Sequence, residues 1–498
     1  MKTLMKIFCF FLLLNGAILG AAQTTGEDIK EDFFHGEEFP ATLESVTRLA
    51  LDNNFDIQLA KYDVLISRTD LDVSESIFDA IINAELKYHN DKSQPASTLL
   101  GTKSLDKDYN LGITKKFPSG ITVAADLTNN RNWSNSSFAT TNPSHDVSLG
   151  VTIKQDLGKN FFGIQDRSGI ALTKSDIIRS EFLSLDKIEQ EISAVQKAYW
   201  DLVLQEERVR IAEDMVEQAK NLFDSNTEKA KDGFVEAPEV IAAEANYRTM
   251  VNNLILEQNQ RKTRENILRL LLNISSDKVC IVPTDKMELD QADEKNERSL
   301  RRAFENRYDY QDVKEDLESK DIRIAMKKNS LWPEINLETT LARNGVDDHF
   351  NQAYQKMVDE DNLDFSIGLT LSMPIKNTEA KAELKAVDLE KAKAILSLKL
   401  IERKVAVNII DQVRECNVLK EVAINSHEIA KLQSRKLEEE QKRFARGRSD
   451  TDTIIRFQED AIQARALAAQ ASHFYYVAVI DLRREEGFLL NKYWDGKI

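Results

Sequence analysis

The sequence contains little glycine and little proline, 17 and 8 residues in a chain of 498. A chain of this length ordinarily forms two or three domains joined by many turns, and turns draw heavily on these two residues. Their scarcity predicts that most of the chain forms long helices with few interruptions.

Cysteine is equally scarce. Cys9 lies in an apolar stretch near the N-terminus, which leaves Cys280 and Cys416 for the rest of the chain. Two cysteines exclude the dense disulfide framework that stabilises small secreted domains, although one bridge between them remains open.

Long apolar runs and a basic surplus are both missing. Beyond residue 22, no segment approaches the roughly 18 apolar residues of a membrane helix, and the mean hydropathy is −0.42. Any segment that lies in a membrane must therefore consist of strands, because only helices and closed sheets satisfy their own backbone groups in lipid. The formal net charge is −16, so no nucleic-acid partner is expected, because phosphate binding needs a basic face.

Residues 1–22 have the pattern of a secretory signal peptide. Lys2 and Lys6 precede an apolar core at 7–14, and small residues at 20–22 suit cleavage by a signal peptidase. The core is too short to span a bilayer as a helix. The sequence therefore predicts export, with a mature chain that starts near Gln23.

The rest of the sequence contains an internal repeat. Residues 50–56 match residues 303–309, and residues 147–153 match residues 365–371. We therefore expect a single protomer, from 23 to 498, that is built from two repeats. These repeats are expected at about 42–273 and 299–487.

Several segments alternate apolar with polar or small side chains, which is typical of strands whose two faces meet different surroundings. The predicted strands lie at about 82–90, 109–128, 147–156, 334–342 and 364–374. The second of these ranges is a hairpin around a Pro-Ser-Gly turn at 118–120. The second repeat has no equivalent of this hairpin.

After its strands, each repeat has a long helical segment, at about 172–231 and about 379–445. Helices of this length extend roughly 90 to 100 Å. Each is followed by a glycine, Gly233 or Gly447, which readily adopts the left-handed conformation that ends a helix. A returning helix then begins, with Pro238 in its first turn in one repeat. In the other repeat, Ser449 and Asp452 form a capping pattern.

The last helix has apolar or small residues at alternating steps of three and four, which predicts a coiled-coil seam. Its alanines allow a close approach of neighbouring helices. The seam consists of Ile454, Phe457, Ala461, Ala464, Ala468, Ala471, Tyr475, Ala478 and Leu482.

This order of strands, long helix, glycine turn and returning helix, repeated once, resembles the TolC-like outer-membrane factor family. The resemblance extends from about Thr42 to Leu490. Its motifs are the Asn-x-aromatic-Asp segment before the first strand of each half, Trp332-Pro333 before a strand, and Gly447-Arg448-Ser449 at a helical turn.

The resemblance implies a mainly α fold with a transmembrane β-barrel portion. Three protomers would form one α/β-barrel tube, with long antiparallel coiled-coil helices and two tandem repeats in each chain. It also implies a channel subunit of a tripartite efflux pump or of a type I secretion system. The expected location is the cell outer membrane and the periplasm. The implied partners are two further copies, a periplasmic adaptor (membrane fusion protein), an inner-membrane transporter and outer-membrane lipid.

The family pattern has four strands in each protomer, and the hairpin at 109–128 departs from it. This hairpin either widens the barrel or extends from it as an extracellular loop. Because long loops are common on the extracellular side of such barrels, the loop is the preferred interpretation.

The two helical turns are the candidate functional sites. The resemblance implies that Gly233, Phe234 and Val235, with Gly447, Arg448 and Ser449, form tips that contact the adaptor. The alternative is that both glycines only end their helices.

The resemblance also points to acidic residues beside the turns as a pore aperture: Asp450 and Asp452, and more weakly Glu236 and Glu239. Threefold symmetry would turn each into a ring of carboxylates that attracts cations. Simple helix capping explains Asp452 equally well. Arg446 and Arg448 are candidates for salt bridges that hold the tip closed, although exposed pairs contribute under about 1 kcal/mol.

Aromatic residues flank the strands and are candidates for girdles at the two membrane surfaces, or for loop packing. They are Tyr109, Trp133, Phe138, Trp332, Phe350 and Tyr354.

An enzyme is not expected. The six histidines are scattered without metal-ligand spacing, and no glycine-rich phosphate loop is present in the sequence. No cofactor and no metal are predicted. A soluble periplasmic coiled-coil adaptor or scaffold without channel activity is the alternative, because it would share the helices. The strands distinguish the two, because an adaptor has no need of their apolar faces.

Overall fold

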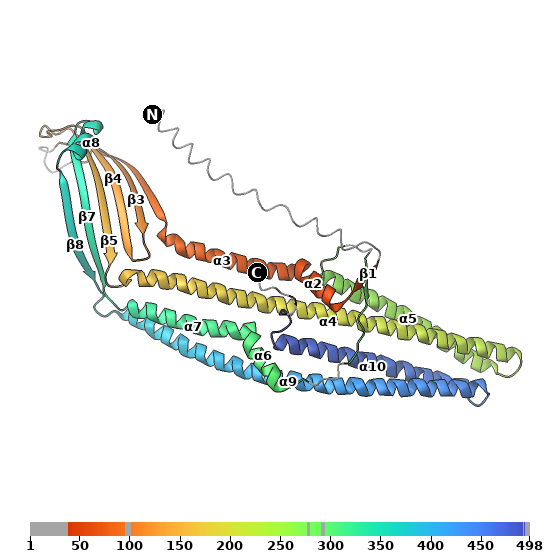
Figure 1. Ribbon diagram of the computed structural model, residues 1–498. Coiled ribbons are helices and arrows are strands. Elements are labelled where there is room, and N and C mark those ends of the chain that lie inside the picture. The colour runs from red at the N-terminus through yellow and green to blue at the C-terminus, as the bar shows by residue number, and fades with distance from the viewer. Residues whose placement is uncertain (1–37, 95–100, 276–278, 290–293, 492, 494–498) are drawn as a thin grey trace.

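The chain is elongated, with a β-sheet at one end and long helices that run away from it (Figure 1). This computed structural model describes residues 38–94, 101–275, 279–289, 294–491 and 493. The predicted signal peptide lies outside these residues. None of the described helices has both the length and the apolar character that crossing a membrane requires.

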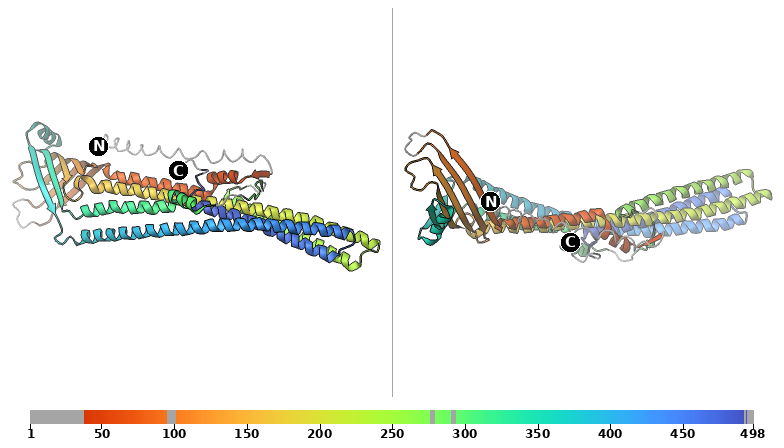
Figure 2. Two further views of the ribbon diagram at one scale, coloured as in Figure 1. Left: turned by 60° about the horizontal axis from the view of Figure 1, so that its bottom comes forward. Right: turned by 90° about the horizontal axis from the view of Figure 1, so that it is seen from above.

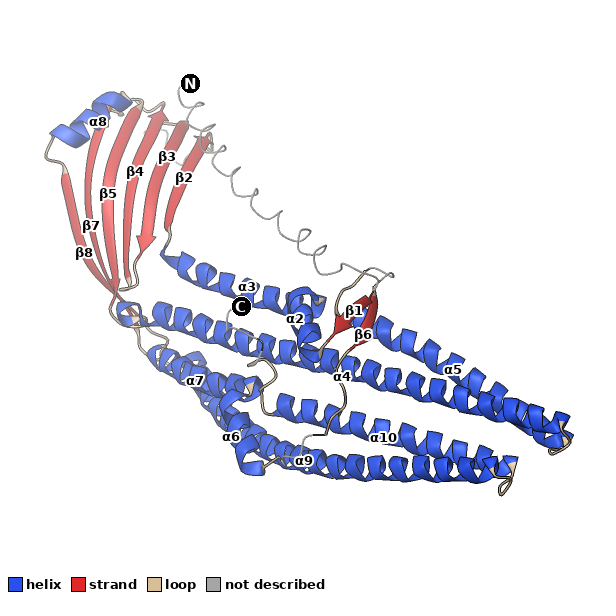
Figure 3. Cartoon of the chain, turned by 45° about the vertical axis from the view of Figure 1, so that its right-hand side comes forward, coloured by secondary structure: helices blue, strands red, loops and turns tan. Residues whose placement is uncertain are grey.

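Six strands form one antiparallel sheet with the order β2-β3-β4-β5-β7-β8 (Figure 3). A strand or hairpin occurs at each predicted position, and all of them except β8 extend further than predicted. The strands are β2 (Ala80–Asp91), β3 (Ser104–Lys116), β4 (Ile121–Ser134), β5 (Ser144–Asp156), β7 (Glu334–Asp347) and β8 (Leu363–Ser372).

The extra hairpin is part of this sheet, so the preference for an extracellular loop is wrong. β3 pairs with β2 from Lys115 opposite Ala80 to Ser104 opposite Asp91. β4 pairs with β5 over a similar length. The hairpin therefore has a bonded strand on both sides, whereas an isolated two-stranded hairpin in water is only marginally stable.

Two helical hairpins of equal dimensions make up the other end of the molecule. Their long helices, α4 (Ile164–Lys231) and α9 (Thr378–Ala445), each have 68 residues, and their returning helices, α5 (Ala237–Leu271) and α10 (Thr451–Glu485), each have 35. At 1.5 Å per residue, each long helix extends about 100 Å. α4 begins eight residues before the predicted position, since Gly169 is accommodated within the helix. In the two further views, the hairpins run side by side, and α10 packs on α4 (Figure 2).

The same turn joins the two helices of each hairpin. Gly233 and Gly447 have φ of 75° and 69°, a left-handed conformation that glycine adopts without strain. The next amide donates back into the helix, from Phe234 N to Lys229 O at 2.9 Å and from Arg448 N to Arg443 O at 3.0 Å. These bonds satisfy carbonyl groups that the end of a helix leaves free.

Shorter elements flank the long helices and the sheet. Two pairs of consecutive helices flank α4 and α9, a small parallel sheet joins β1 to β6, and one short helix lies between β7 and β8. These elements are β1 (Glu38–Ala41), α2 (Leu43–Asn53), α3 (Phe55–Glu75), η1 (Ser76–Phe78), η2 (Phe161–Gly163), β6 (Cys280–Pro283), α6 (Asn296–Asn306), α7 (Tyr308–Asn329) and α8 (Phe350–Asp359).

The repeated segments at 50–56 and 303–309 mark the same break in each half. Asn54 and Arg307 both have extended backbones and separate α2 from α3 and α6 from α7. The Asn54 side chain accepts a hydrogen bond from Ile57 N at 3.0 Å, which caps α3. Arg307 instead pairs with Asp309 and Glu485. The break is thus shared, but its side-chain chemistry differs.

The predicted seam of α10 faces its neighbours. Alanines 461, 464, 468, 471 and 478 are all buried, as are Ile454, Tyr475 and Leu482. Phe457 is the exception, because its ring lies half-buried under Lys436, with the Nζ atom 3.8 Å from the ring centroid. The small side chains let α10 pack closely against both α9 and α4.

The largest apolar core surrounds the middle of α4. Tyr199 is fully buried, and its hydroxyl donates to Ala41 O at 3.0 Å and contacts Asp285 Oδ2 at 2.9 Å. The C-terminal segment reaches the same core through Leu489 and Leu490. Cys280 and Cys416 are both free, so the disulfide that the sequence left open is not formed.

Glu189 on α4 holds the C-terminal segment. This side chain is 2% exposed and accepts hydrogen bonds from Leu489 N at 2.8 Å and Leu490 N at 3.5 Å. Burial raises the pKa of Glu189 to about 7, although these two bonds oppose the shift. Folding therefore favours the protonated carboxyl group of Glu189. The stability that this protonated group contributes is lost as the pH rises from about 4.5 through 7.

We predict that Glu189→Gln removes this loss, because the amide keeps an acceptor and does not ionise. At pH 8 the variant should hold the C-terminal segment more firmly by about 1 to 3 kcal/mol, with little difference at pH 4. Hydrogen exchange at the amides of Leu489 and Leu490 measures this effect. An identical pH dependence in both proteins would contradict it.

Candidate functional site: the sheet and the helical tips

The sheet has one apolar face. Residues opposite one another in an antiparallel sheet point to the same side, so the register defines rows that cross all six strands. One such row is entirely apolar, and its large side chains are exposed. It consists of Ile82, Ile113, Ala125, Val151, Leu341 and Phe365.

The opposite face is polar. The adjacent row contains Asn83, Gly112, Asp126, Gly150, Ala342 and Asp364. Further carboxylates on this face include Glu85, Asp108 and Glu338, while Lys87 and Lys154 are among its few cations. The sheet thus has one apolar surface and one acidic, polar surface.

The sheet also ends in two bare edges. Within the described chain, β2 pairs only with β3 and β8 pairs only with β7. Every residue of β8 is exposed, including Ile367 at 65% and Leu369 at 66%. Unpaired backbone groups at such an edge bind another strand readily, and each costs several kcal/mol if it enters lipid unpaired.

The predicted aromatic residues lie at different heights on the sheet. Phe350 and Tyr354 are half exposed on α8, at the end remote from the long helices, and Trp332 is 63% exposed at the opposite end. Tyr109 lies in the middle of β3, opposite Leu86, so it does not belong to either end. Trp133 is on β4 with Lys103 Nζ 5.7 Å from its ring centroid.

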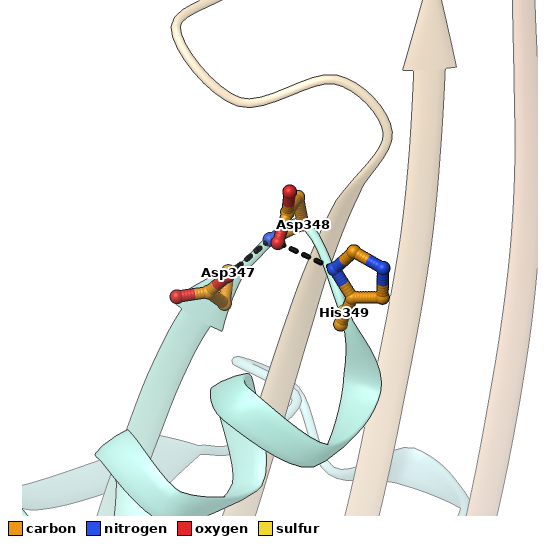
Figure 4. A group of neighbouring side chains, drawn as sticks. All are labelled: Asp347, Asp348 and His349. Carbon is orange, nitrogen blue, oxygen red and sulfur yellow. Dashed lines mark hydrogen bonds and ion pairs between the residues drawn. The ribbon is translucent and has the colours of Figure 1, made fainter.

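A cluster that the sequence did not predict lies between the end of β7 and the start of α8. Asp347, Asp348 and His349 bring ligand atoms within 4.8 Å of one another (Figure 4). Such a group is a candidate for a cation. However, Asp347 is paired with Lys356 at 2.6 Å, and His349 Nδ1 lies 2.7 Å from Asp348. Because the lysine already neutralises a carboxylate, we assign these residues to stabilising the start of α8.

The helical tips lie at the end of the molecule remote from the sheet (Figure 1). Phe234 is 82% exposed, Gly233 and Gly447 have open space around them, and Val235 and Ser449 are half-buried. The turns therefore end their helices and also present side chains outward.

A buried polar contact joins the two tips. Asn226 on α4 is fully buried and donates through Nδ2 to Thr451 Oγ1 at 2.9 Å, and Thr451 Oγ1 donates to Glu239 Oε2 at 2.8 Å. Further from the tips, Asn246 Nδ2 donates to Gln458 Oε1 at 3.0 Å. Glu239, a weaker aperture candidate, therefore takes part in holding the hairpins together, whereas Glu236 is exposed.

The cap of α10 differs from the prediction. Asp450, not Ser449, is the capping residue, and its Oδ1 accepts a hydrogen bond from Thr453 N at 2.8 Å. The bonds from the backbone and side chain of Thr453 lower the pKa of Asp450, which keeps it ionised. Asp452 is exposed in the first turn of α10 and is not the capping residue.

Ion pairs near this turn do not involve the predicted arginines. Lys442 pairs with Glu438 at 2.9 Å, and Arg443 pairs with Glu440 at 3.0 Å. Among the residues that the structure describes, no ion pair includes Arg446 or Arg448 within the single chain. Both side chains are exposed.

We predict that Thr451→Val weakens the contact between the tips, because the buried Asn226 amide loses its acceptor at 2.9 Å and keeps only the longer bond to Glu239 O at 3.4 Å. The expected loss is about 1 to 3 kcal/mol, seen as faster hydrogen exchange in the last turns of α4 and the first turns of α10. Thr227→Val is the matched control, since its hydroxyl bonds only within α4, to Phe223 O. Equal effects of the two variants would contradict the assignment.

The chain resembles solved structures of membrane channels. The chain is similar to CusC, described for its transmembrane channel formation, with a TM-score of 0.68 and 14% identity over 94% of this chain and 95% of that chain. It is similar to the Campylobacter jejuni CmeC outer membrane channel, with a TM-score of 0.62 and 15% identity over 90% and 85% of the two chains. For the Neisseria gonorrhoeae MtrE outer membrane channel, the TM-score is 0.65, with 14% identity over 89% and 88%.

The likeness is one of structure rather than of sequence. No protein-family model and no curated protein matches the sequence. An identity of 14 or 15% is compatible with a shared fold, because burial pattern and turn positions, more than residue identity, specify it. The chain has the fold of the TolC-like outer-membrane channels.

Proposed function

We propose that the protein is a channel subunit of the outer membrane, and that three copies form a tube through this membrane and across the periplasm. The sheet carries the proposal. It has an apolar face, an acidic polar face and two bare edges. Such a sheet is stable in lipid only when further copies pair with both edges and close it into a barrel.

The helical part supports the same proposal. α4 and α9 are long enough, at about 100 Å each, to continue a tube well beyond the membrane. Their exposed apolar residues, such as Leu183 at 55% and Leu396 at 66%, are available for packing against neighbouring copies. Large exposed apolar patches on a folded chain mark sites of association.

The tips are the proposed meeting point with other components. We propose that the exposed turns at 233–235 and 447–449 contact a periplasmic adaptor, which links the tube to an inner-membrane transporter. The assembly would serve either efflux or type I secretion. The similarity to channels supports transport, and the proposed role includes no catalysis.

The second candidate, a soluble periplasmic adaptor, is disfavoured by the exposed apolar row on the sheet. The two roles predict different extraction behaviour. A channel should stay in the outer membrane through washes with high salt and alkali, and should form ion-conducting pores in planar bilayers after release by detergent. Release by alkali without any pore activity would favour the adaptor.

A further prediction concerns the acidic residues at the second tip. If Asp450 and Asp452 line the aperture, replacing both with alanine should raise the single-channel conductance or abolish block by multivalent cations. Alanine at 450 also removes the cap of α10, at about 1 kcal/mol. Single-channel recording of the double-alanine variant and of the parent protein provides the measurement.

The double variant Asp450→Asn and Asp452→Asn separates charge from capping. Asparagine caps a helix about as well as aspartate, so this variant changes the charge and leaves the turn intact. An aperture predicts that it behaves like the alanine variant. If its single-channel conductance and its block by multivalent cations equal those of the parent protein, Asp450 acts only as a cap.

A further inference from the structure

We propose that the barrel has eighteen strands, six from each of three chains, with the β3–β4 hairpin forming part of its wall. This inference rests on the proposed trimeric channel and adds the size of its pore. The resemblance to the family implies four strands in each chain, and therefore a barrel of twelve.

The pairing of the hairpin is the first observation. β3 is bonded to β2 on one side and to β4 on the other, and β4 is bonded to β5. No pairing of β2 with β5 occurs in the sheet. Folding the hairpin out of the wall would break two complete ladders of backbone hydrogen bonds, at β2–β3 and β4–β5. It would form only one new ladder, between β2 and β5.

The two faces of the hairpin are the second observation. Leu111 and Ile113 continue the apolar face between β2 and β4, and both are about half exposed. Asp108 and Asp126 continue the polar face. A loop in water has no need of an exposed apolar face on one side only, whereas a barrel wall does.

The edges are the third observation. Because an even number of strands alternates in direction, β2 and β8 run antiparallel to each other. β8 of one copy is thus correctly oriented to pair with β2 of the next. The lengths are compatible, at 12 and 10 residues, and both strands alternate apolar and polar positions. The same joint, repeated three times, closes a ring.

The consequence is a wider pore. Barrel diameter grows roughly linearly with strand number, so eighteen strands give a barrel about one and a half times as wide as twelve. Barrels of about 16 to 18 strands leave an aqueous channel. The hairpin also adds Asp106, Asp108 and Asp126 to the face that lines this channel.

Cysteine labelling in intact cells tests the position of the hairpin. The full chain first receives Cys280→Ser and Cys416→Ala, and then one cysteine at a time. Leu111→Cys and Asn110→Cys report the two faces of the hairpin, while Ile367→Cys and Ser366→Cys report the two faces of β8. A water-soluble maleimide should label positions 110 and 366 at least about tenfold faster than 111 and 367, because a thiol in lipid does not ionise.

The four positions distinguish two kinds of failure. If 111 is labelled as fast as 110 while 367 remains protected, the hairpin lies in water, and the eighteen-stranded wall is wrong although the channel stands. If 367 is also labelled as fast as 366, the sheet does not face lipid, and the proposed channel itself is wrong.

Deletion of residues 104–134 tests the width directly. β2 and β5 are antiparallel, so the shortened chain retains four strands that can pair. The largest polymer that enters the pore from the sheet side should decrease in diameter by about a third. An unchanged limit in an assembled trimer would overturn the inference. If the shortened chain does not assemble, the labelling ratio at 110 and 111 decides.

Discussion

The unpaired backbone at the two edges of the sheet is the constraint on which the rest of the structure depends. β2 and β8 each have one bonded neighbour in the chain, and the face beside them is apolar. Water satisfies bare edges, but lipid does not, and apolar side chains disfavour water. A single copy in water therefore exposes its apolar face, and a single copy in lipid leaves its edge groups unpaired. Pairing between copies meets both, so the fold specifies an assembly rather than a complete molecule.

The helical part is consistent with this requirement. Two hairpins of equal length lie side by side, and the alanines of α10 bring them close together. Polar contacts, such as Asn226 with Thr451 and Asn246 with Gln458, fix their relative position near the tips. Buried polar pairs of this kind contribute less to stability than to register, since a displaced helix would leave them unsatisfied. The tips thus hold a defined arrangement while Phe234 remains exposed.

The features that sequence predicted well are local ones. Alternating side chains identified strands, and glycines at 233 and 447 identified helix ends, because each depends on a few adjacent residues. The position of the hairpin at 104–134 depends on pairing across the sheet, so the sequence left it open. The α10 cap was predicted one residue too early, at Ser449 instead of Asp450. Several neighbouring side chains can cap a helix, and the one that does so is set by where the backbone is extended before the helix begins, which here is at Asp450. Contacts such as Glu189 with Leu489, 300 residues apart, have no sequence signal.

The mass of the assembly tests the central claim most directly. The full chain would be extracted from membranes in a mild detergent and its mass measured by native mass spectrometry, with lipid and detergent removed in the gas phase. The account predicts a complex of three chains that survives extraction, because each β2 edge is bonded to a neighbouring β8. A stable monomer that remains soluble without detergent would contradict it.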